Sequence, residues 1–590
     1  MKSFLKRAIV IVLALAMVFG VAGCDLFKKT NKGHTDLFWY MNLTEEKEGG
    51  KEVKFTSNEG DVAAVALEDS YAEEYGIVKN GDCFVNIDSL KSGVDDRFYY
   101  DKNEKLVMFT NATEVITSEV GKNELTNGEE KDYQISFVEN GKCYVNMDFV
   151  TDCISAEYKL FEAKKKCPAI ISLNYKTGKV KEATLDDDIE MRTNGDYQNL
   201  IVKDLKEGTK IKIIEEGENW DKVKAEGGII GFVPTKYVED IRTVESVYKS
   251  DEDTYNHQLI KDGVNMVWDA VYNQSANANL KNDVKHVKGV NVISPTWFEM
   301  ESKTGGLVSR ASEDYIKTAH KNGMEVWALL DDFKSKKISH YVLSHTSSRK
   351  RLISSLMDSI DGLGADGINI DFEFVTESVA KDYLQFLREM SVECRKNRIT
   401  MSVDNYAAMG HTAYYDWKQQ YKIADYVIFM NYDEHNAGDD EAGSVSSLEF
   451  MENAITNSVE QIGESNRVIN GIPFFTRLWE MTPEGKGTNK GTYVEDAVDG
   501  NYYLNSQALT MNKAEKACKD ANVKPTFDKP TGQNYATWEK GSTTYEIWLE
   551  DETSIKSRLE LTKKYKLGGN AYWALGQEKD SIWNTIEANK

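Results

Sequence analysis

The chain has 590 residues, 41% of them hydrophobic, and a formal net charge of −24 at pH 7. One hydrophobic core does not grow to this length, so several domains are expected. The acidic charge argues against a surface for nucleic acid or anionic membranes. Because only 7 prolines and no low-complexity stretch occur, we expect most of the chain to be folded.

The first residues have the composition of an export signal. Lys2, Lys6 and Arg7 precede an apolar stretch that ends in small residues. The stretch is short for a membrane anchor of about 20 residues. Its end, Val21-Ala22-Gly23 before Cys24, resembles the bacterial lipobox. The resemblance implies a signal peptide over 1–23 and a lipid on Cys24. The chain would then sit in the cell-wall space, anchored to the outer face of the cytoplasmic membrane; simple secretion is the alternative.

The six cysteines after Cys24 are too widely spread for a disulfide framework or for a zinc site with close ligand pairs. Cys153 and Cys167 can pair in an oxidising exterior, and the sequence leaves their state open. We expect no structural metal and no cofactor.

Two segments in the first third of the chain repeat one another at an offset of 60 residues, IVKNGDCFVNIDSL at 77–90 and FVENGKCYVNMDFV at 137–150. The Asn-Gly pairs predict a hairpin in each. The repeat resembles the duplicated amino-terminal domain of copper amine oxidases, an accessory wall module without copper in many exported proteins. We expect this domain over 24–180. A spacer that lifts the next domain off the membrane is an equally good interpretation.

Short β-type runs separated by Gly-containing turns predict a small all-β domain over 181–241. Its end, WDKVKAEGGIIGFVPTKYV, resembles bacterial SH3 domains, which implies docking on cell-wall peptides. Trp220 and Tyr237 fit that role or, equally, the core of a small barrel. The polar residues 242–260 are expected to form a linker.

From Lys261 onward β-type runs alternate with amphipathic helices, such as the one that Leu352, Leu356 and Leu363 indicate. This alternation predicts an α/β fold with a parallel sheet. Eight units in about 330 residues favour a (β/α)8 TIM barrel over 261–590. The candidate strands begin at Val264, Gly289, Glu325, Asp366, Ile399, Asp425, Arg467 and Gly569. The long gap before the eighth predicts an insertion.

The fourth candidate strand, GADGINIDFEF at 364–374, alternates apolar and polar residues. Asn369, Asp371 and Glu373 therefore share the face that points into the barrel, near the mouth where barrel enzymes place active sites. The two carboxyl groups, about 7 Å apart along the strand, can set each other's protonation. One charged and one protonated carboxyl suit acid-assisted glycosidic cleavage. A solvated strand face is the alternative, but a buried parallel strand has none outside the barrel mouth.

This strand resembles the signature of glycoside hydrolase family 18. The runs MNYD at 430–433, GIPFFTRLW at 471–479 and YWALGQE at 572–578 match the sixth, seventh and eighth strands of that family. The runs SPTWF and VWALL point to its spore and cell-wall peptidoglycan branch. Together the matches cover nearly all of 261–590.

The resemblance implies a retaining mechanism in which the substrate's own 2-acetamido group attacks the anomeric carbon. Glu373 would protonate the leaving oxygen and later activate water. Asp371 would orient the acetamido group, and Tyr432 would donate a hydrogen bond to its carbonyl oxygen. Substrate contacts are expected from Asn369, Asp433, Trp573, Trp297 and Met430. Trp573 would form the floor under the sugar ring; barrel-core packing is the alternative for Tyr432 and Trp573.

The remaining residues of the motif region have structural or altered roles. Asp366 and Gly367 are expected to serve structure at the site, Asp366 as a hydrogen-bond acceptor at the strand entrance. Phe475 stands where many relatives have Tyr. Asn369 replaces the Asp that, in well-studied chitinases, shares a proton with the next carboxylate. We expect Asn369 to hydrogen-bond Asp371, and Glu373 to keep its acid-base role.

We therefore expect an exported, membrane-anchored glycosidase that hydrolyses β-1,4 bonds of N-acetylglucosamine-containing polymers. The wall-type modules favour peptidoglycan, and chitin oligomers are the alternative substrate. A carbohydrate-binding wall protein without catalysis is the alternative of a different class, and it would have no chemical need for Glu373.

Overall fold

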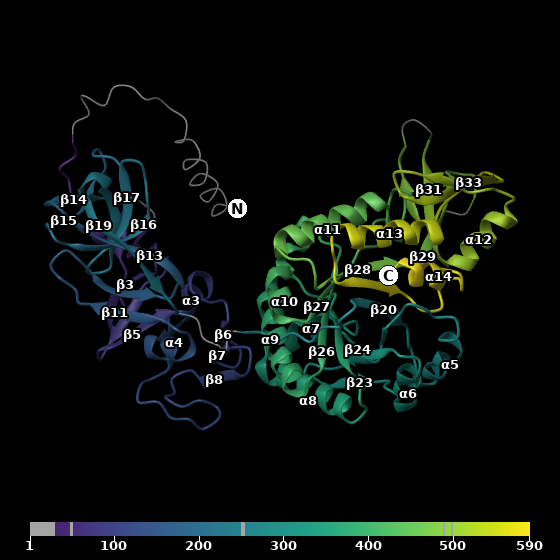
Figure 1. Ribbon diagram of the computed structural model, residues 1–590, viewed down its shortest axis with the longest axis horizontal. Helices are drawn as coiled ribbons and strands as arrows, with labels where there is room; N and C mark the ends of the chain where they lie inside the picture. Colours follow the sequence, from purple (N-terminus) through teal and green to yellow (C-terminus); the bar gives the residue numbers. More distant parts are fainter. Residues whose placement is uncertain (1–29, 48–50, 249–253, 488–489, 497–499, 590) are drawn as a thin grey trace. The chain divides into compact units, whose positions relative to one another are not determined.

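The computed structural model describes residues 30–47, 51–248, 254–487, 490–496 and 500–589 (Figure 1). The chain divides into two compact units, one of residues 1–96 and 132–249, the other of residues 97–131 and 250–590. We call them the first unit and the second unit. The expected signal peptide and Cys24 lie outside the described residues. In the described ranges no helix combines the length and the apolar character that crossing a membrane requires.

The first unit contains a seven-stranded sheet of order β11-β12-β3-β4-β5-β10-β9. Both predicted hairpins are confirmed, each with a left-handed Asn at its turn. Asn86 and Asn146 then cap the helices that follow. The elements are β3 (Asp61–Ala66), β4 (Gly76–Lys79), β5 (Asp82–Asn86), α3 (Ile87–Gly93), β9 (Ser136–Glu139), β10 (Lys142–Asn146), α4 (Met147–Cys153), β11 (Glu157–Phe161) and β12 (Ala169–Asn174). Cys167 carries a thiol, so the disulfide that the sequence leaves open is not formed.

A second seven-stranded sheet of the first unit has the order β15-β14-β18-β17-β16-β13-β19. Its strands are β13 (Gly178–Leu185), β14 (Ile189–Arg192), β15 (Ile201–Leu205), β16 (Lys210–Glu215), β17 (Trp220–Ala225), β18 (Ile229–Pro234) and β19 (Val238–Ser246). Trp220 is partly buried against Tyr197, with ring centroids 4.8 Å apart. The linker predicted at 242–260 starts too early in the sequence, because residues up to Ser246 still belong to β19, which pairs with β13.

The second unit is built on a closed barrel of eight parallel strands, which β21 and β24 complete by pairing (Figure 1). All eight predicted strands are confirmed: β20 (Val264–Asp269), β21 (Val292–Pro295), β24 (Glu325–Asp331), β25 (Gly367–Asp371), β26 (Thr400–Tyr406), β27 (Tyr426–Met430), β28 (Val468–Pro473) and β35 (Gly569–Trp573). Ile368, Ile370 and Phe372 pack in the layer between strands and helices, as their alternation predicts. The chain reaches the barrel earlier than expected, since the backbone N–H of Gln258 donates to Asp425.

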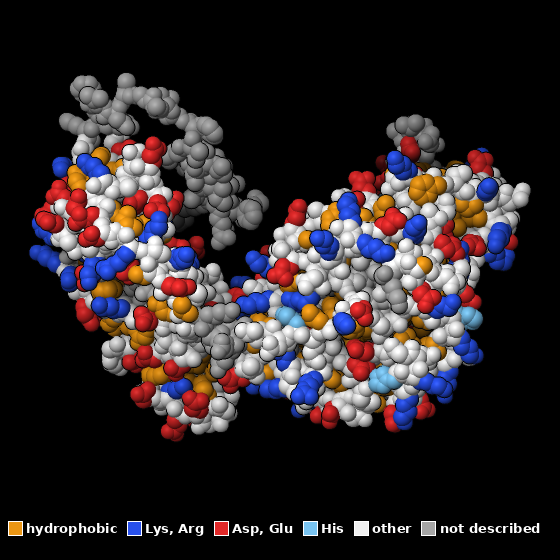
Figure 2. All heavy atoms as spheres, viewed as in Figure 1, with side chains coloured by type: hydrophobic (Ala, Val, Ile, Leu, Met, Phe, Trp, Pro, Cys, Tyr) orange, Lys and Arg blue, Asp and Glu red, His pale blue; other side chains and the backbone are white. Residues whose placement is uncertain are grey.

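Helices cover the outside of the barrel (Figure 1). They include α6 (Glu313–Lys321), α7 (Lys336–Ser344), α8 (Thr346–Asp361), α9 (Ala380–Asn397), α10 (Trp417–Ile423), α11 (Leu448–Ile462), α13 (Glu552–Lys564) and α14 (Ile582–Asn589). Two short strands, β22 (Phe298–Met300) and β23 (Leu307–Ser309), extend the sheet beside β24. On the face seen in Figure 2, acidic and basic side chains intermix, which is typical of a solvated surface.

The predicted insertion before the eighth strand is confirmed as an antiparallel sheet with one helix. Its elements are β29 (Phe475–Pro483), β30 (Thr492–Val494), β31 (Tyr502–Thr510), α12 (Met511–Asp520), β32 (Thr526–Asp528), β33 (Gln533–Lys540) and β34 (Thr543–Leu549). A small core around Leu509, Ala514 and Ile547 holds the sheet and helix together. The insertion begins directly after β28, so its first strand lies at the barrel mouth.

Residues 97–131 depart from the expected domain boundaries, because they pack on the barrel rather than with 24–96. They form a three-stranded sheet of β6 (Phe98–Asp101), β7 (Leu106–Thr110) and β8 (Val115–Glu119). Asp101 Oδ2 accepts hydrogen bonds from the backbone N–H of Thr346 at 2.8 Å and from its hydroxyl at 2.7 Å. Glu104 accepts from the N–H of Ser347 at 2.9 Å. These carboxylates therefore cap α8, whose own N-cap residue makes no side-chain capping bond to the helix.

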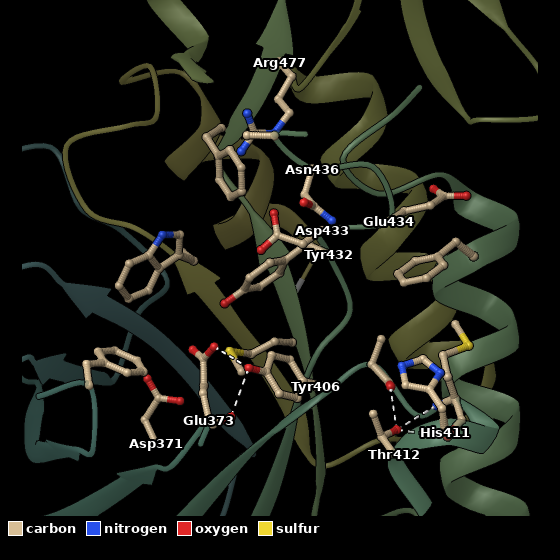
Figure 3. Close-up of a pocket in the computed structure, with 18 of the residues that line it drawn as sticks. Asp371, Glu373, Tyr406, His411, Thr412, Tyr432, Asp433, Glu434, Asn436 and Arg477 are labelled. Carbon is tan, nitrogen blue, oxygen red and sulfur yellow. Dashed lines mark hydrogen bonds between the residues drawn. The ribbon is translucent and has the colours of Figure 1, made fainter. Parts of the chain in front are cut away.

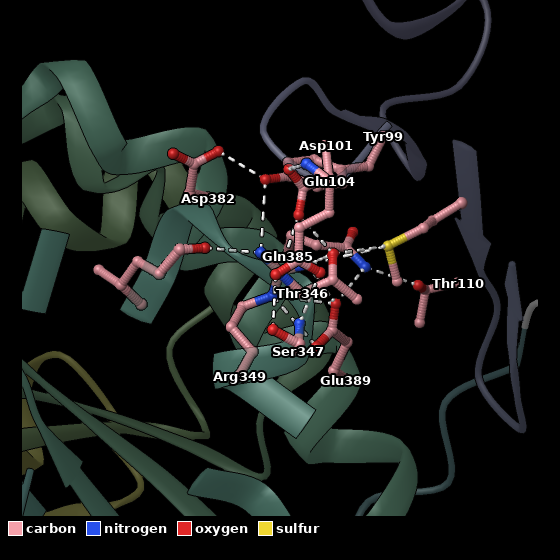
Figure 4. A network of polar contacts seen from close by, with 12 residues as sticks. Tyr99, Asp101, Glu104, Thr110, Thr346, Ser347, Arg349, Asp382, Gln385 and Glu389 are labelled. Carbon is pink, nitrogen blue, oxygen red and sulfur yellow. Dashed lines mark hydrogen bonds and ion pairs between the residues drawn. The ribbon is translucent and has the colours of Figure 1, made fainter. Parts of the chain in front are cut away.

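A buried ion pair lies beside this cap (Figure 4). Arg349 and Glu389 approach to 2.9 Å and are almost fully buried. Gln385 donates to Glu389 at 3.0 Å and to the Thr110 hydroxyl of β7 at 2.9 Å. A buried charge is tolerated only when paired and hydrogen-bonded. The three-stranded sheet thus completes a polar network inside the second unit, although it lies about 245 residues away in sequence.

We predict that Asp101→Ala lowers the free energy of unfolding of the second unit by about 1–3 kcal/mol, because it leaves the buried N–H of Thr346 without an acceptor. Glu119→Ala, at the exposed end of the same sheet, is the matched control and should change little. Urea unfolding of the full chain, followed by tryptophan fluorescence, measures both. Equal effects of the two substitutions would contradict the capping role.

Candidate active site

A cavity of about 750 Å³ opens at the carboxyl ends of the barrel strands (Figure 3). Most of the residues predicted from the sequence meet there. The lining includes Asp371, Glu373, Met430, Tyr432, Asp433, Phe475 and Trp573, together with Phe333, Tyr406, Tyr414, Asn436 and Arg477. Most of them come from the ends of β25, β26, β27 and β35 and from the first strand of the insertion. Phe333 follows β24, and Tyr414 and Asn436 lie in the segments after β26 and β27. The wall is acidic and aromatic.

Glu373 lies just beyond the end of β25 and faces the cavity. Its Oε2 accepts a hydrogen bond of 2.8 Å from the Tyr406 hydroxyl at the end of β26, and its backbone N–H donates to Asp332 at 3.0 Å. Burial raises the pKa of Glu373; the negative charges of Asp332 and Asp433 add to the rise, and the Tyr406 hydrogen bond opposes it. The protonated form therefore persists to higher pH than in an exposed glutamate, as a general acid requires.

Asp371 is a buried carboxyl of the site. Burial raises its pKa well above the usual range, and the negative charges of Glu373 and Asp404 act in the same direction. Its Oδ1 is buried and has no hydrogen-bond partner among the described residues. A carboxyl in these surroundings favours the neutral acid.

Asn369 does not line the cavity, and it does not bond Asp371 as expected. Its Oδ1 accepts from Trp268 Nε1 at 2.9 Å and from the Ser294 hydroxyl at 3.1 Å. Its Nδ2 donates to the Ser402 hydroxyl at 3.0 Å and to Asp404 Oδ1 at 2.7 Å. These four bonds use the full capacity of an amide. Asn369 is therefore a buried connector between strands and not a substrate contact.

Tyr432 and Asp433 lie side by side after β27. Burial holds the pKa of Tyr432 well above its usual range, so the hydroxyl remains a hydrogen-bond donor. Burial also raises the pKa of Asp433, against the attraction of Arg477 from the insertion. The Phe475 ring meets the Tyr432 ring edge-on with centroids 6.1 Å apart, so this position supplies an apolar wall.

Trp573 lines the cavity, and its contact with a sugar ring stays a prediction. Its ring lies 6.0 Å from that of Trp268, in an edge-on arrangement. Trp573 is only partly buried, which leaves indole surface available to a ligand. Met430 also lines the cavity, at the end of β27.

Trp297 was expected to contact substrate, and the structure corrects this. It is fully buried in the layer between strands and helices, where its ring lies 5.1 Å from that of Tyr315. Its Nε1 donates to Asn277 at 2.8 Å. Trp297 follows the end of β21 and turns outward, so its size serves the core and not the cavity.

Asp366 and Gly367 lie at the start of β25, away from the cavity. Asp366 Oδ2 accepts from the backbone N–H of Val326 at 2.8 Å and lies 2.8 Å from Nε2 of His320, which is the structural role expected. A Cβ on Gly367 would overlap the Trp327 indole and the Thr400 carbonyl. Both residues therefore fix the strand and not the site itself.

Several residues of the site were not predicted from the sequence, above all Tyr406 and Asp404 on β26. A signal for them exists, because Ser402, Asp404 and Tyr406 repeat on β26 the alternation that singled out β25. Asp331 at the end of β24 pairs with Asp371 in register. Burial raises the pKa of Asp331 to about 7 and that of Asp404 to about 8. The mouth of the barrel thus gathers carboxyl groups that hold protons near neutral pH.

Comparisons with known proteins agree with this geometry. The profile described as "Glycosyl hydrolases family 18" matches residues 259–578. The "Uncharacterized glycosylase YvbX" of Bacillus subtilis is 27% identical over 328 residues, which cover 53% of this chain and 89% of that protein. The "Cortical fragment-lytic enzyme" of Bacillus subtilis is 21% identical over 257 residues, or 42% of this chain and 55% of that protein. This chain thus spans about half the length of the second relative.

Solved structures are similar to the same part of the chain. The spore cortex-lytic enzyme SleL of Bacillus megaterium aligns with a TM-score of 0.46 and 20% identity, covering 59% of this chain and 77% of that one. The C-terminal domain of a putative chitinase from Desulfitobacterium hafniense aligns with a TM-score of 0.49 and 20% identity, covering 55% of this chain and 99% of that one.

Tyr406→Phe is expected to raise the pKa of Glu373 further, because the lost hydroxyl hydrogen bond stabilises the carboxylate. The titration can be followed by NMR on protein with ¹³C-labelled glutamate carboxyls, with Glu373→Gln to assign the signal. Tyr414→Phe is the matched control, since Tyr414 lines the same cavity but donates to the Val375 carbonyl. An unchanged midpoint in Tyr406→Phe would show that the hydroxyl does not govern Glu373.

Proposed function

The chain belongs to glycosyl hydrolases family 18 and is a glycoside hydrolase; from this premise we propose that it cleaves β-1,4 bonds of N-acetylglucosamine-containing polymers, with peptidoglycan as the favoured substrate. The observation that carries the proposal is the placement of Glu373. A carboxyl whose pKa burial raises faces a cavity together with Asp371 and Tyr432. A site that only bound carbohydrate would not need a buried acid there.

The proposed reaction is substrate-assisted. Glu373 gives its proton to the glycosidic oxygen as the bond to the anomeric carbon breaks. The carbonyl oxygen of the substrate's 2-acetamido group forms the new bond to that carbon, while Asp371 faces the acetamido nitrogen and Tyr432 donates to the carbonyl oxygen. The Glu373 carboxylate then takes a proton from water, whose oxygen displaces the acetamido group. The configuration of the anomeric carbon is retained after the two displacements.

The shape of the cavity supports a sugar polymer as the ligand. Trp573, Phe333 and Tyr406 present aromatic surface, which stacks well on sugar rings, and Asn436 and Asp433 offer hydrogen-bonding groups. Peptidoglycan is favoured over chitin because one relative is named a cortical fragment-lytic enzyme and because wall-type modules are expected before the barrel. Chitin oligomers remain the second substrate to test.

We also propose that the first unit attaches the enzyme to the wall. The unit has a hollow of about 700 Å³ lined by residues that include Trp39, Gln198 and Leu200. Trp39 and Leu200 are exposed there. Gln198 and Leu200 lie in the loop between β14 and β15, in the domain that resembles bacterial SH3 domains. A cell-wall peptide is the proposed ligand of this hollow, and the repeated hairpins are proposed as an accessory or spacer domain.

If the hollow binds the wall, less of a Trp39→Ala chain than of the wild-type chain should pellet with peptidoglycan. Equal amounts of the two chains in the pellet would contradict the docking.

The composition of residues 1–24 supports a further proposal, export and lipidation of Cys24. The chain would then act from the outer face of the cytoplasmic membrane, within reach of peptidoglycan. Absence of fatty-acid label on the wild-type chain, when expressed in a bacterium that processes lipoproteins, would contradict this localisation.

Glu373→Gln in the full chain should reduce hydrolysis of peptidoglycan by at least roughly 100-fold, the usual share of a general acid. Glu377→Gln, an exposed glutamate in the same loop, is the matched control and should retain activity. New reducing ends on purified peptidoglycan and on chitin oligomers are the measurement. A wild-type chain that cleaves neither polymer would contradict the enzymatic proposal. Activity on chitin alone would identify chitin, and not peptidoglycan, as the substrate.

A further inference from the structure

Two buried carboxyl groups lie next to one another on neighbouring strands below the cavity. The parallel register of β25 and β26 pairs Asn369 with Ser402 and Ile370 with Val403. The next residues along the two strands are Asp371 and Asp404. Since paired strands run about 4.8 Å apart and both residues alternate with core-facing neighbours, both carboxyls point into the barrel.

Each of these carboxyl groups has one oxygen without a partner. Among the described residues, Oδ1 of Asp371 and Oδ2 of Asp404 are buried and receive no hydrogen bond. A buried polar atom left unsatisfied destabilises the fold, and native structures keep few such atoms. One proton held between the two carboxyls would satisfy both oxygens at once.

The amide of Asn369 determines which oxygen of Asp404 is available. Trp268 and Ser294 both donate to Oδ1 of Asn369, so its NH₂ group must point the other way. There it donates to Oδ1 of Asp404 at 2.7 Å. Oδ2 of Asp404 is therefore the oxygen that remains for a neighbouring carboxyl.

The charged groups around the pair disfavour two carboxylates. Asp331 lies at the end of β24 and Asp332 follows it, Glu373 lies just beyond the end of β25, and Asp433 lies in the loop after β27. The pKa of Asp371 stands well above its usual range through burial and through the charges of Glu373, Asp404, Asp331 and Asp332. Tyr406 and Tyr432 also lie at the mouth, and burial raises the pKa of each, so both are neutral; Arg477, His411, Tyr414 and Glu434 line the cavity as well. Two charges of the same sign at this separation in a buried site cannot both persist, so the pair holds a proton.

We infer that Asp404 is a positioning residue that shares one proton with Asp371, and so supplies from β26 the carboxyl partner that Asn369 cannot supply from β25. The inference rests on the proposed function. As the acetamido oxygen attacks the anomeric carbon, positive charge develops on the acetamido N–H. The shared proton then moves to Asp404, which leaves Asp371 as a carboxylate beside that charge. When water completes the reaction, the proton returns to Asp371, so the pair gains and loses none over the cycle.

Exchange of the two residues tests this assignment. Asp404→Asn keeps the shape of the side chain but removes the proton partner, and should lower kcat roughly 10- to 100-fold with little change in KM. The double variant Asn369→Asp with Asp404→Asn returns a carboxyl neighbour to Asp371 and preserves an acid–amide pair between the two strands. Its kcat should be at least tenfold higher than that of Asp404→Asn alone. Because the exchange also restores the acid–amide hydrogen bond, the free energy of unfolding of both variants is measured by urea. A kcat that recovers while the two variants are equally stable identifies the shared proton, and a kcat that only follows stability identifies a merely structural Asp404.

A second measurement does not depend on activity. In the full chain with ¹³C-labelled aspartate carboxyls, Asp404→Asn should lower the titration midpoint of Asp371, because a negative neighbour is removed. An unchanged midpoint, full activity of Asp404→Asn, or a double variant no better than the single one would each overturn the inference. If the wild type cleaves no glycan while the midpoint falls, the proposed function fails and the shared proton stands.

Discussion

The side chain of Asn369 ties the inside of the barrel together below the cavity. Its four hydrogen bonds reach Trp268 on β20, Ser294 on β21, and Ser402 and Asp404 on β26. These bonds thereby hold β20, β21 and β26 to β25. A carboxylate in its place could accept from Trp268 and Ser294 but would meet Asp404 as a second acid. The amide is therefore matched to its neighbours, and the carboxyl groups above it are positioned by a neutral connector.

Burial then decides the chemistry of those carboxyl groups. Asp331, Asp371, Glu373 and Asp404 converge from three adjacent strands, and the pKa of each is raised, first of all by burial. At Glu373 the hydrogen bond from the Tyr406 hydroxyl opposes this rise, because it stabilises the charged form. The outermost acid can therefore exchange its proton during a reaction, while the buried pair of Asp371 and Asp404 retains the proton that it shares.

The eight strands could be predicted from the sequence, because the alternation of apolar and other residues along a strand is a local property. The same alternation within one strand places Asp371 and Glu373 on one face. Asp404 was not assigned, although the alternation on β26 marks it, because the residue-by-residue register that places it beside Asp371 is not a local property of either strand. Trp297 was misplaced because the chain turns outward directly after β21. The sheet of residues 97–131 was assigned to the wrong domain, because its partners on α8 and α9 lie far along the chain.

The stereochemistry of the first product tests the account most directly. A soluble β-1,4-linked glycan that carries 2-acetamido groups is mixed with the full chain, and the anomeric protons of the new reducing end are followed by ¹H NMR. The account predicts that the β anomer forms first and mutarotates later, because the acetamido group and then water each invert the same carbon. Initial release of the α anomer would contradict it, since water would then have attacked directly and neither Asp371 nor its proton would have the role described.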